Sequence, residues 1–174
     1  SQNDAVRKAF AAWQDAASNC SDLTFVETAS TDSRRVEKDG EIEVIFRKVL
    51  CEDVVRGDDP CWIDGSCGNK HDCWSHPATE AAILTSVYSR PSGELLDVDI
   101  ELNAASFLFT TVDAPPCPAD GLAATCVAYD LQSVVTHALG HLLGLDNNDL
   151  PGSTMAEALT VGDASKRGID PGSQ

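Results

Sequence analysis

Apolar residues at every third or fourth position predict two helices. The first follows Asp4, which can cap it, and its apolar stripe comprises Ala5, Val6, Ala9, Phe10, Trp13 and Ala17. The second is expected to begin after the cap residue Asp130 and to end near Gly144. After Asn147 we expect a loop with at most one short turn.

Alternating apolar and polar residues predict four strands, at residues 23–27, 41–49, 82–88 and 95–102. Pro91 and Gly93 lie between the last two runs, so these are expected to pair as a hairpin. In the second strand of the hairpin, Asp97, Asp99 and Glu101 share one face. We expect that face to be solvated rather than to bind a cation.

The length of the chain indicates the number of domains, and its charge excludes some kinds of binding partner. A chain of 174 residues predicts one domain. The 12 lysine and arginine residues against 28 aspartate and glutamate residues give a net charge of −16, which argues against binding nucleic acid or an anionic membrane surface. Such a surface attracts cations, among which Ca²⁺ is a candidate. No apolar run approaches the ~20 residues that span a bilayer.

Seven cysteines indicate disulfide bonds and therefore an oxidising compartment; they are Cys20, Cys51, Cys61, Cys67, Cys73, Cys117 and Cys126. Four of them lie in the aperiodic stretch 51–79, which is expected to be a long stapled loop. Cys117 and Cys126 are close enough in the sequence for a local bridge. Because seven is odd, one cysteine is left without a partner in the chain. We expect a mature segment of a secreted, extracellular protein.

A pair of histidines holds the most informative chemistry. His137 and His141 are four residues apart on the second predicted helix, so both imidazoles project from the same side. Two neutral imidazole nitrogens can then bind one Zn²⁺ at about 2.0–2.1 Å. Gly144 allows the chain to turn sharply and to bring back a third ligand. The pair alone is weak support for a metal site.

The surrounding residues resemble the zinc signature of the metzincin metallopeptidases, His-Glu-x-x-His-x-x-Gly-x-x-His/Asp, which a Met-turn follows. The chain reads HALGHLLGLDNNDLPGSTM, similar to the matrixin pattern HELGHALGLDHSxxPxxxM. The residues in register after the histidines are Gly144, Leu145, Asp146, Pro151 and Met155, the last being the only methionine. With DLTFVE and ILTSVYSRPSGELLDVDIELN upstream, the likeness spans roughly residues 4–165 and is greatest to secreted bacterial matrixin-like proteases.

The resemblance implies a fold. It is an α+β fold in which the N-terminal helix and the zinc-binding helix pack on a twisted mixed sheet of four or five strands. An irregular C-terminal part with the Met-turn would follow, so that one catalytic domain covers residues 1–174. Its upper part would end near residue 144, and residues 145–174 would form a short lower part. Matrixins continue into a further helix, so we expect that the chain is truncated.

The resemblance also implies a site and an activity, that of a secreted zinc-dependent endopeptidase. His137 and His141 would bind one catalytic Zn²⁺ with Asn147 as third ligand, and Met155 would form an apolar floor beneath the metal. An extended substrate would pair with the edge strand that comprises Ile83, Leu84, Thr85, Ser86, Val87 and Tyr88. Expected partners are peptide or protein substrates and a pro-segment or inhibitor, and we expect a monomer.

Ala138 stands at the position of the family's catalytic Glu. In the family this carboxylate takes a proton from the attacking water and delivers it to the leaving amine. A methyl group can do neither, so we predict that the chain binds metal and peptide but hydrolyses very poorly. Either the Glu was replaced deliberately or the protein is a natural pseudoenzyme that binds peptides. The intact surroundings favour a deliberate replacement.

Asn147 departs from the family pattern as well, because a neutral amide is a poorer zinc ligand than imidazole or carboxylate. Asp146, Asp149 or water are alternatives for the third position, and Asn147 is otherwise a plain loop residue. The residues after Met155 are Ala156 and Glu157 instead of the usual Tyr-Pro, so the family's specificity is not carried over.

The stapled loop also contains His71 and His76, but the hairpin strands lack the histidines that complete the structural zinc site of animal matrixins. A zinc site of Cys61, Cys67, Cys73 and His71 is conceivable, yet an oxidising compartment favours disulfides. We therefore expect cystines to replace metal as the clamp of this loop. A cystine-stapled structural domain with incidental histidines is the remaining alternative for the whole chain.

Overall fold

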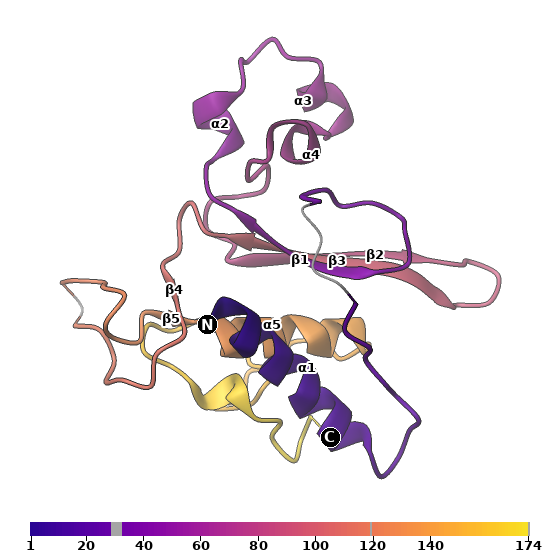
Figure 1. Cartoon of the computed structure of the whole chain (residues 1–174), viewed down its shortest axis with the longest axis vertical. Coiled ribbons are helices and arrows are strands. Elements are labelled where there is room, and N and C mark those ends of the chain that lie inside the picture. The colour runs from indigo at the N-terminus through magenta and orange to yellow at the C-terminus, as the bar shows by residue number, and fades with distance from the viewer. Residues whose placement is uncertain (29–32, 119, 174) are drawn as a thin grey trace. The chain divides into compact units, whose positions relative to one another are not determined.

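The computed structural model describes residues 1–28, 33–118 and 120–173. The chain divides into two compact units (Figure 1). One, here called the helical unit, comprises Ser1–Ala29 and Leu108–Gln174, and the other, the sheet unit, comprises Ser30–Phe107. Among the described residues, no helix has the length and apolar character needed to cross a membrane.

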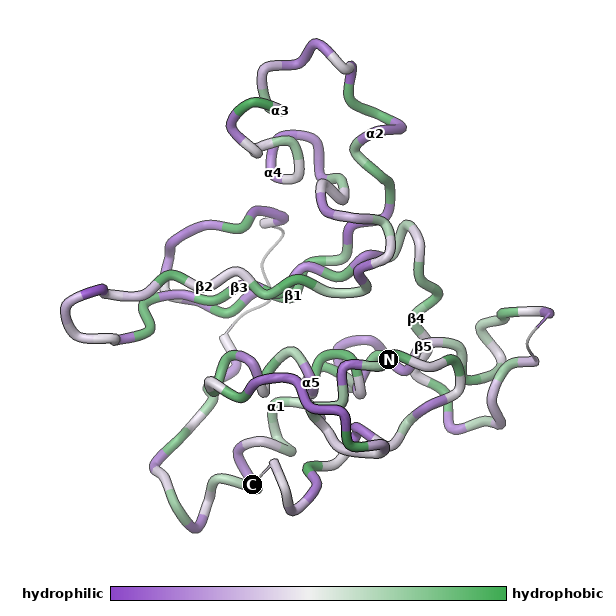
Figure 2. The backbone as a smooth tube through the Cα atoms, turned by 180° about the vertical axis from the view of Figure 1, so that it is seen from behind, coloured by the Kyte–Doolittle hydropathy of each residue, from purple (hydrophilic) through white to green (hydrophobic). Residues whose placement is uncertain are grey.

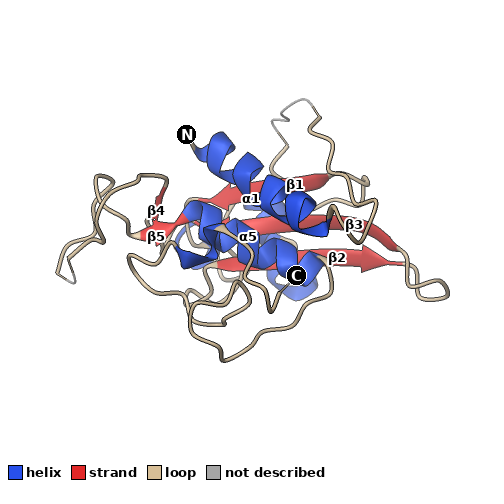
Figure 3. Ribbon diagram, turned by 90° about the horizontal axis from the view of Figure 1, so that it is seen from below, coloured by secondary structure: helices blue, strands red, loops and turns tan. Residues whose placement is uncertain are grey.

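The helical unit is built on two helices that pack side by side, α1 (Gln2–Ala17) and α5 (Leu131–Leu142) (Figure 3). Both were predicted from the sequence, and Asp130 caps α5 as expected by accepting a hydrogen bond from the Ser133 N–H at 2.9 Å. The cap of α1 was predicted wrongly. Ser1 is the cap and Asp4 lies three residues into the helix, where the two side chains form a reciprocal capping box.

Trp13 joins the two helices. It is buried with Ala5 and Ala9 on the apolar stripe of α1, and its indole Nε1–H donates to the Thr136 carbonyl of α5 at 2.7 Å. The unit also contains a short parallel pair, β4 (Phe109–Thr110) and β5 (Tyr129–Asp130), and a 3₁₀ turn η1 (Ser165–Arg167). The disulfide Cys117–Cys126 closes the loop between β4 and β5, which confirms the predicted local bridge.

The sheet unit contains three paired strands, β1 (Ile42–Arg47), β2 (Ala82–Tyr88) and β3 (Leu95–Asn103), in the order β1-β3-β2. The predicted hairpin is confirmed because β2 and β3 are antiparallel, whereas β1 runs parallel to β3. In Figure 2 hydrophobic and hydrophilic residues alternate along the strands, and hydrophilic residues occupy the turn between β2 and β3. The mixed sheet and the helices confirm the α+β class.

The number of strands in the sheet was overestimated. Residues 23–27 form no strand, and the described part of this sheet has three strands instead of four or five. The segment is bound to α1 instead: the Phe25 N–H donates to Gln14 at 2.9 Å, and the rings of Phe25 and Phe10 meet edge to face at 4.9 Å. Alternating polarity suits a chain that packs along a helix as well as a strand, which explains the wrong prediction.

The stapled loop was correctly predicted from its cysteines. It contains three short helices, α2 (Cys51–Val54), α3 (Cys61–Asp64) and α4 (Cys67–His71), and two disulfides, Cys51–Cys73 and Cys61–Cys67. Cys20 is the odd cysteine, exposed and without a disulfide.

The acidic face of β3 is buried, which corrects the expectation of a solvated face. Asp97, Asp99 and Glu101 are each less than one-tenth exposed. Backbone N–H groups of the segment before and within β1 donate to two of them: Gly40 to Asp97 at 2.8 Å, and Glu37 and Glu43 to Asp99 at 3.1 and 3.0 Å. Because these donors are distant from β3 in the sequence, the local pattern of residues could not predict that the acids are buried.

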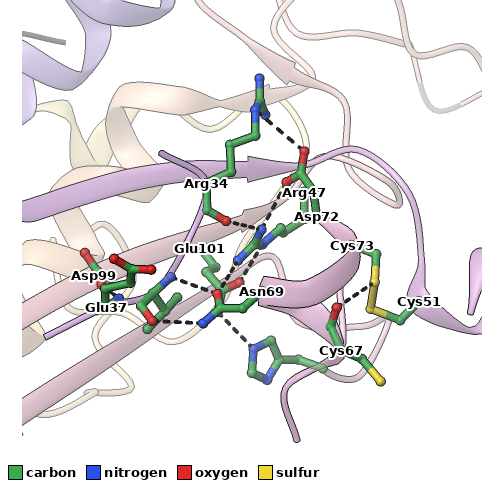
Figure 4. A network of polar contacts seen from close by, with 12 residues as sticks. Arg34, Glu37, Arg47, Cys51, Cys67, Asn69, Asp72, Cys73, Asp99 and Glu101 are labelled. Carbon is green, nitrogen blue, oxygen red and sulfur yellow. Dashed lines mark hydrogen bonds and ion pairs between the residues drawn. A yellow bond between two sulfur atoms is a disulfide. The ribbon is translucent and has the colours of Figure 1, made fainter. Parts of the chain in front are cut away.

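The third acid, Glu101, belongs to a buried network around Arg47 (Figure 4). The Arg47 guanidinium donates to Glu101 at 2.6 Å, to Asp72 at 3.0 Å and to Asn69 at 3.2 Å. Burial opposes ionisation of Glu101, but contacts from His76 and Arg47 outweigh it and lower the pKa of this carboxyl. The network therefore ties the stapled loop to β1 and β3 with paired charges.

Glu43 and Asp99 are direct neighbours across β1 and β3, and they generate a prediction about pH. Burial, followed by nearby carboxylates, raises the pKa of Glu43 to about 6, and burial likewise raises the pKa of Asp99 to about 6. The folded chain thus retains protons that the unfolded chain releases from about pH 4 upwards, and these two groups make it less stable as the pH rises through 6.

Glu43→Gln removes one of the two like charges. We expect the free energy of unfolding at pH 7.5 to rise by about 0.5 kcal/mol, with little change at pH 4.5. Urea unfolding at both pH values measures this, with Glu94→Gln in the exposed hairpin turn as the matched control. Equal effects of the two substitutions would contradict the prediction.

Candidate metal centre

The two histidines of α5 meet as the sequence predicts. The Nε2 atoms of His137 and His141 are 3.2 Å apart, and both rings are partly buried. The helix places them one turn apart on the same side, and Gly144 follows with a φ of 87°, which a side chain rarely adopts. The sharp turn expected after the helix is therefore present.

Backbone carbonyls hold the other nitrogen of each ring. The Nδ1 of His137 lies 2.9 Å from the Thr154 oxygen, and the Nδ1 of His141 lies 2.9 Å from the Leu145 oxygen. Because a carbonyl only accepts hydrogen bonds, each Nδ1 must carry the proton. In a neutral ring the Nε2 then presents its lone pair, which is the arrangement seen in metal-binding histidines with a supporting acceptor.

The two lone pairs fit a zinc ion. Zn–N bonds of about 2.0–2.1 Å in a tetrahedron place two ligand nitrogens about 3.3 Å apart, and the observed separation is 3.2 Å. Burial lowers the pKa of His137 to about 4, so this ring is neutral at pH 7. At this distance the Nε2 of His137 can accept a proton held on the Nε2 of His141, or the two atoms can hold a metal ion between them.

Position 138 offers no polar atom. Ala138 is buried on α5 directly after His137, so it contributes packing and no proton transfer.

The described residues provide no clear third ligand beside the two histidines. In the described part of the chain, no Asp, Glu, Cys or further His places a ligand atom within 4.8 Å of both ring nitrogens. Asp146 and Asp149 are exposed, and Asp146 accepts the backbone N–H of Asn147 at 2.9 Å. Asn147 is itself exposed. The structure thus brings together His137 and His141 but not the two carboxylates.

Met155 lies against the histidine helix. It is 2% exposed, and a Cβ built on Gly140 would overlap its Sδ and lie 3.0 Å from the Trp13 ring. Its neighbour Thr154 supplies the carbonyl that binds His137. Two neighbouring residues, Thr154 and Met155, therefore contact α5, one at His137 and the other at Gly140.

The C-terminal residues stabilise the start of α5. Arg167 donates to Asp130, the cap residue, from Nη2 at 2.6 Å and from Nε at 3.0 Å, and it is also paired with Asp113. The Gln132 side chain donates to the Arg167 carbonyl at 3.0 Å. These residues and Thr154 were not predicted from the sequence, because an Arg or Thr in an irregular tail has no periodic signal.

The expected edge strand is part of β2, the last strand in the order β1-β3-β2. Within the described ranges, residues 83–88 pair with β3 alone, with a register shift between Val87 and Tyr88. This position suits the addition of an extended peptide as a further strand.

The stapled loop contains a second group of potential metal ligands, Asp59, Cys61 and His71, within 4.8 Å of one another. Cys61 is bonded to Cys67, so it offers no thiolate while the disulfide is closed. Lys70 donates to Asp59 at 2.8 Å and is the main cause that lowers the pKa of this carboxyl to about 2. The conceivable cysteine–histidine zinc site would require both disulfides of the loop to open.

Neither the protein-family models nor the curated proteins contain a match to this chain. The resemblance to metzincins therefore rests on the residues themselves, above all residues 137–155.

Gly140→Ala tests the contact between the helix and Met155. Although alanine favours a helix, the added methyl must displace Met155 and Trp13 from a filled space, so we expect the protein to lose about 1–3 kcal/mol of stability. Thermal unfolding measures the loss. Gly121→Ala is the control, because the nearest atom to an added Cβ there lies at 4.0 Å. An unchanged melting temperature for Gly140→Ala would show that Met155 does not pack there.

Proposed function

We propose that the chain is a metzincin-like zinc-binding domain, built as a secreted endopeptidase and inactive as it stands because of Ala138. The observation that supports the proposal best is the geometry of the histidine pair. Two Nε2 atoms lie 3.2 Å apart, and carbonyl oxygens fix the protons on the opposite nitrogens. This arrangement suits a metal ion, because both Nε2 atoms lie within reach of one ion.

His137 and His141 would hold the zinc, and a bound zinc would act as a Lewis acid on a peptide carbonyl. The carbonyls of Thr154 and Leu145 keep both rings oriented for this task. Met155 is an apolar neighbour rather than a ligand, since it is buried against Gly140. A substrate peptide would bind in extended form along residues 83–88 of β2.

Proton transfer is the missing part. Neither abstraction of a proton from water nor its delivery to the leaving amine can occur at a methyl group. General acid–base participation contributes about 10²–10⁴-fold to a rate, so a chain with Ala138 is expected to bind peptides and to cleave them at a residual rate.

A natural peptide-binding pseudoenzyme is the second candidate. It is favoured by the second departure of the site, because the carboxylates of Asp146 and Asp149 do not join the histidine pair and Asn147 stands in the third position. An enzyme inactivated at one residue would be expected to keep a strong third ligand.

In either case a pro-segment or inhibitor is a natural partner, and we propose that the domain is monomeric.

The localisation is proposed from the covalent structure. Three disulfides join Cys51–Cys73, Cys61–Cys67 and Cys117–Cys126. They are compatible with an oxidising compartment and with an extracellular protein.

Zinc binding is the first test. We expect one zinc ion per chain at pH 7.5, measured by equilibrium dialysis with elemental analysis, and at least 10²-fold weaker binding in His137→Ala and in His141→Ala because a two-nitrogen chelate is lost. His71→Ala is the control and should bind zinc normally. Absence of tight binding in the unsubstituted chain would favour the cystine-stapled structural domain, and a second ion lost in His71→Ala would place metal in the stapled loop.

Restoring the acid is the second test. Ala138→Glu with bound zinc is expected to cleave casein at least 10²-fold faster than the parent and to be inhibited by o-phenanthroline. Ala138→Gln is the matched control because it has the same size and no carboxyl group. The double change Ala138→Glu and Asn147→His should be faster again if the third ligand also limits the rate. If the Glu and Gln forms are equally slow, the pseudoenzyme becomes the better proposal.

A further inference from the structure

One carboxylate near the C-terminus organises the segment that supports His137. The Oδ1 of Asp170 accepts hydrogen bonds from the Thr154 N–H at 2.7 Å, the Ser173 hydroxyl at 2.7 Å and the Ser153 hydroxyl at 3.1 Å. Its Oδ2 accepts the Gly172 N–H at 2.9 Å. Four donors on one carboxylate are characteristic of a group whose charge is part of the structure.

The contact with Thr154 is reciprocal. The Asp170 N–H donates to the Thr154 hydroxyl at 3.0 Å, and this hydroxyl donates to the Gly168 carbonyl at 3.0 Å. Thr154 is fully buried and is therefore held by both its backbone and its side chain. Its remaining polar group, the carbonyl oxygen, faces the Nδ1 of His137 at 2.9 Å.

The two histidines differ in what supports them. The Leu145 carbonyl that binds His141 comes from the turn that ends α5, where the Leu145 N–H bonds to Gly140 at 3.0 Å. That support is local to the helix end. The Thr154 carbonyl comes from a segment 17 residues after His137 and depends on the residues that anchor it.

We propose that Asp170 is a positioning residue, which fixes the Thr154 carbonyl and thereby keeps the proton of His137 on Nδ1 and its Nε2 free for a metal. The consequence for metal binding rests on the proposed zinc function. The consequence for the tautomer does not, because it concerns the metal-free ring. Burial opposes ionisation of Asp170, but its hydrogen-bond donors outweigh burial and lower the pKa of the carboxyl well below its usual range.

Asp170→Asn is the decisive variant. The amide keeps the size of the carboxyl but replaces one acceptor with a donor, so it cannot accept all the bonds that Asp170 does. In metal-free protein, ¹⁵N–¹H spectra of the imidazole rings should show that His137 shifts towards the Nε2–H tautomer while His141 stays Nδ1–H. Zinc affinity should fall by about 10–100-fold, as is typical when the support of a metal ligand is removed.

Asp163→Asn is the matched control. Asp163 belongs to the same tail, and its carboxylate accepts the Ser165 N–H at 2.8 Å. We expect this variant to keep the Nδ1–H tautomer of His137 and the parent zinc affinity. Ser173→Ala, which removes one donor from Asp170, is a milder variant in case Asp170→Asn does not fold, and a smaller shift in the same direction is expected.

An unchanged His137 tautomer in folded Asp170→Asn, or in Ser173→Ala when only that variant folds, overturns the proposal. Equal losses of zinc affinity in Asp170→Asn and Asp163→Asn overturn it as well. Failure of the proposed function has a different signature: the unsubstituted chain would not bind zinc, while the tautomer measurement would still report on Asp170.

Discussion

A carbonyl oxygen accepts hydrogen bonds and never donates them, and this constraint determines the chemistry of α5. It places a proton on the Nδ1 of His137 and on the Nδ1 of His141, and the two Nε2 atoms lie 3.2 Å apart. An Nε2–Nε2 separation of 3.2 Å allows the two rings to share a proton or to hold a metal ion. The helical unit therefore contains the histidine pair on which the proposed metal site depends.

The support of that arrangement extends through the rest of the helical unit. α1 packs on α5 through Trp13, whose indole binds the Thr136 carbonyl immediately before His137. Met155 lies against Gly140, and a residue larger than glycine there would collide with it. Positions 138 and 147 depart from the metzincin pattern that the chain resembles, while the carbonyls that orient the two histidines are in place.

The sheet unit contains buried charged residues. Arg47 and Glu101 are both buried, and an isolated buried charge is costly. All three nitrogens of the Arg47 guanidinium donate hydrogen bonds, to carboxylate, amide and carbonyl oxygens. Together with the disulfides Cys51–Cys73 and Cys61–Cys67, these contacts hold the stapled loop, and Glu43 beside Asp99 remains as a like-charge pair that is disfavoured at neutral pH.

The sequence by itself determined what depends on near neighbours: both long helices, the Asp130 cap, the β2–β3 hairpin and the spacing that makes His137 and His141 converge. Caps, turns and helical periodicity depend on a few neighbouring residues, so they can be predicted from the sequence. Tertiary structure alone decided the unpaired course of residues 23–27, the burial of Asp97, Asp99 and Glu101, and the support of His137 by Thr154 and Asp170. In each of these cases the hydrogen-bonding or packing partner is distant in the sequence. The residues next to a polar side chain do not indicate which distant donor or acceptor it will bind.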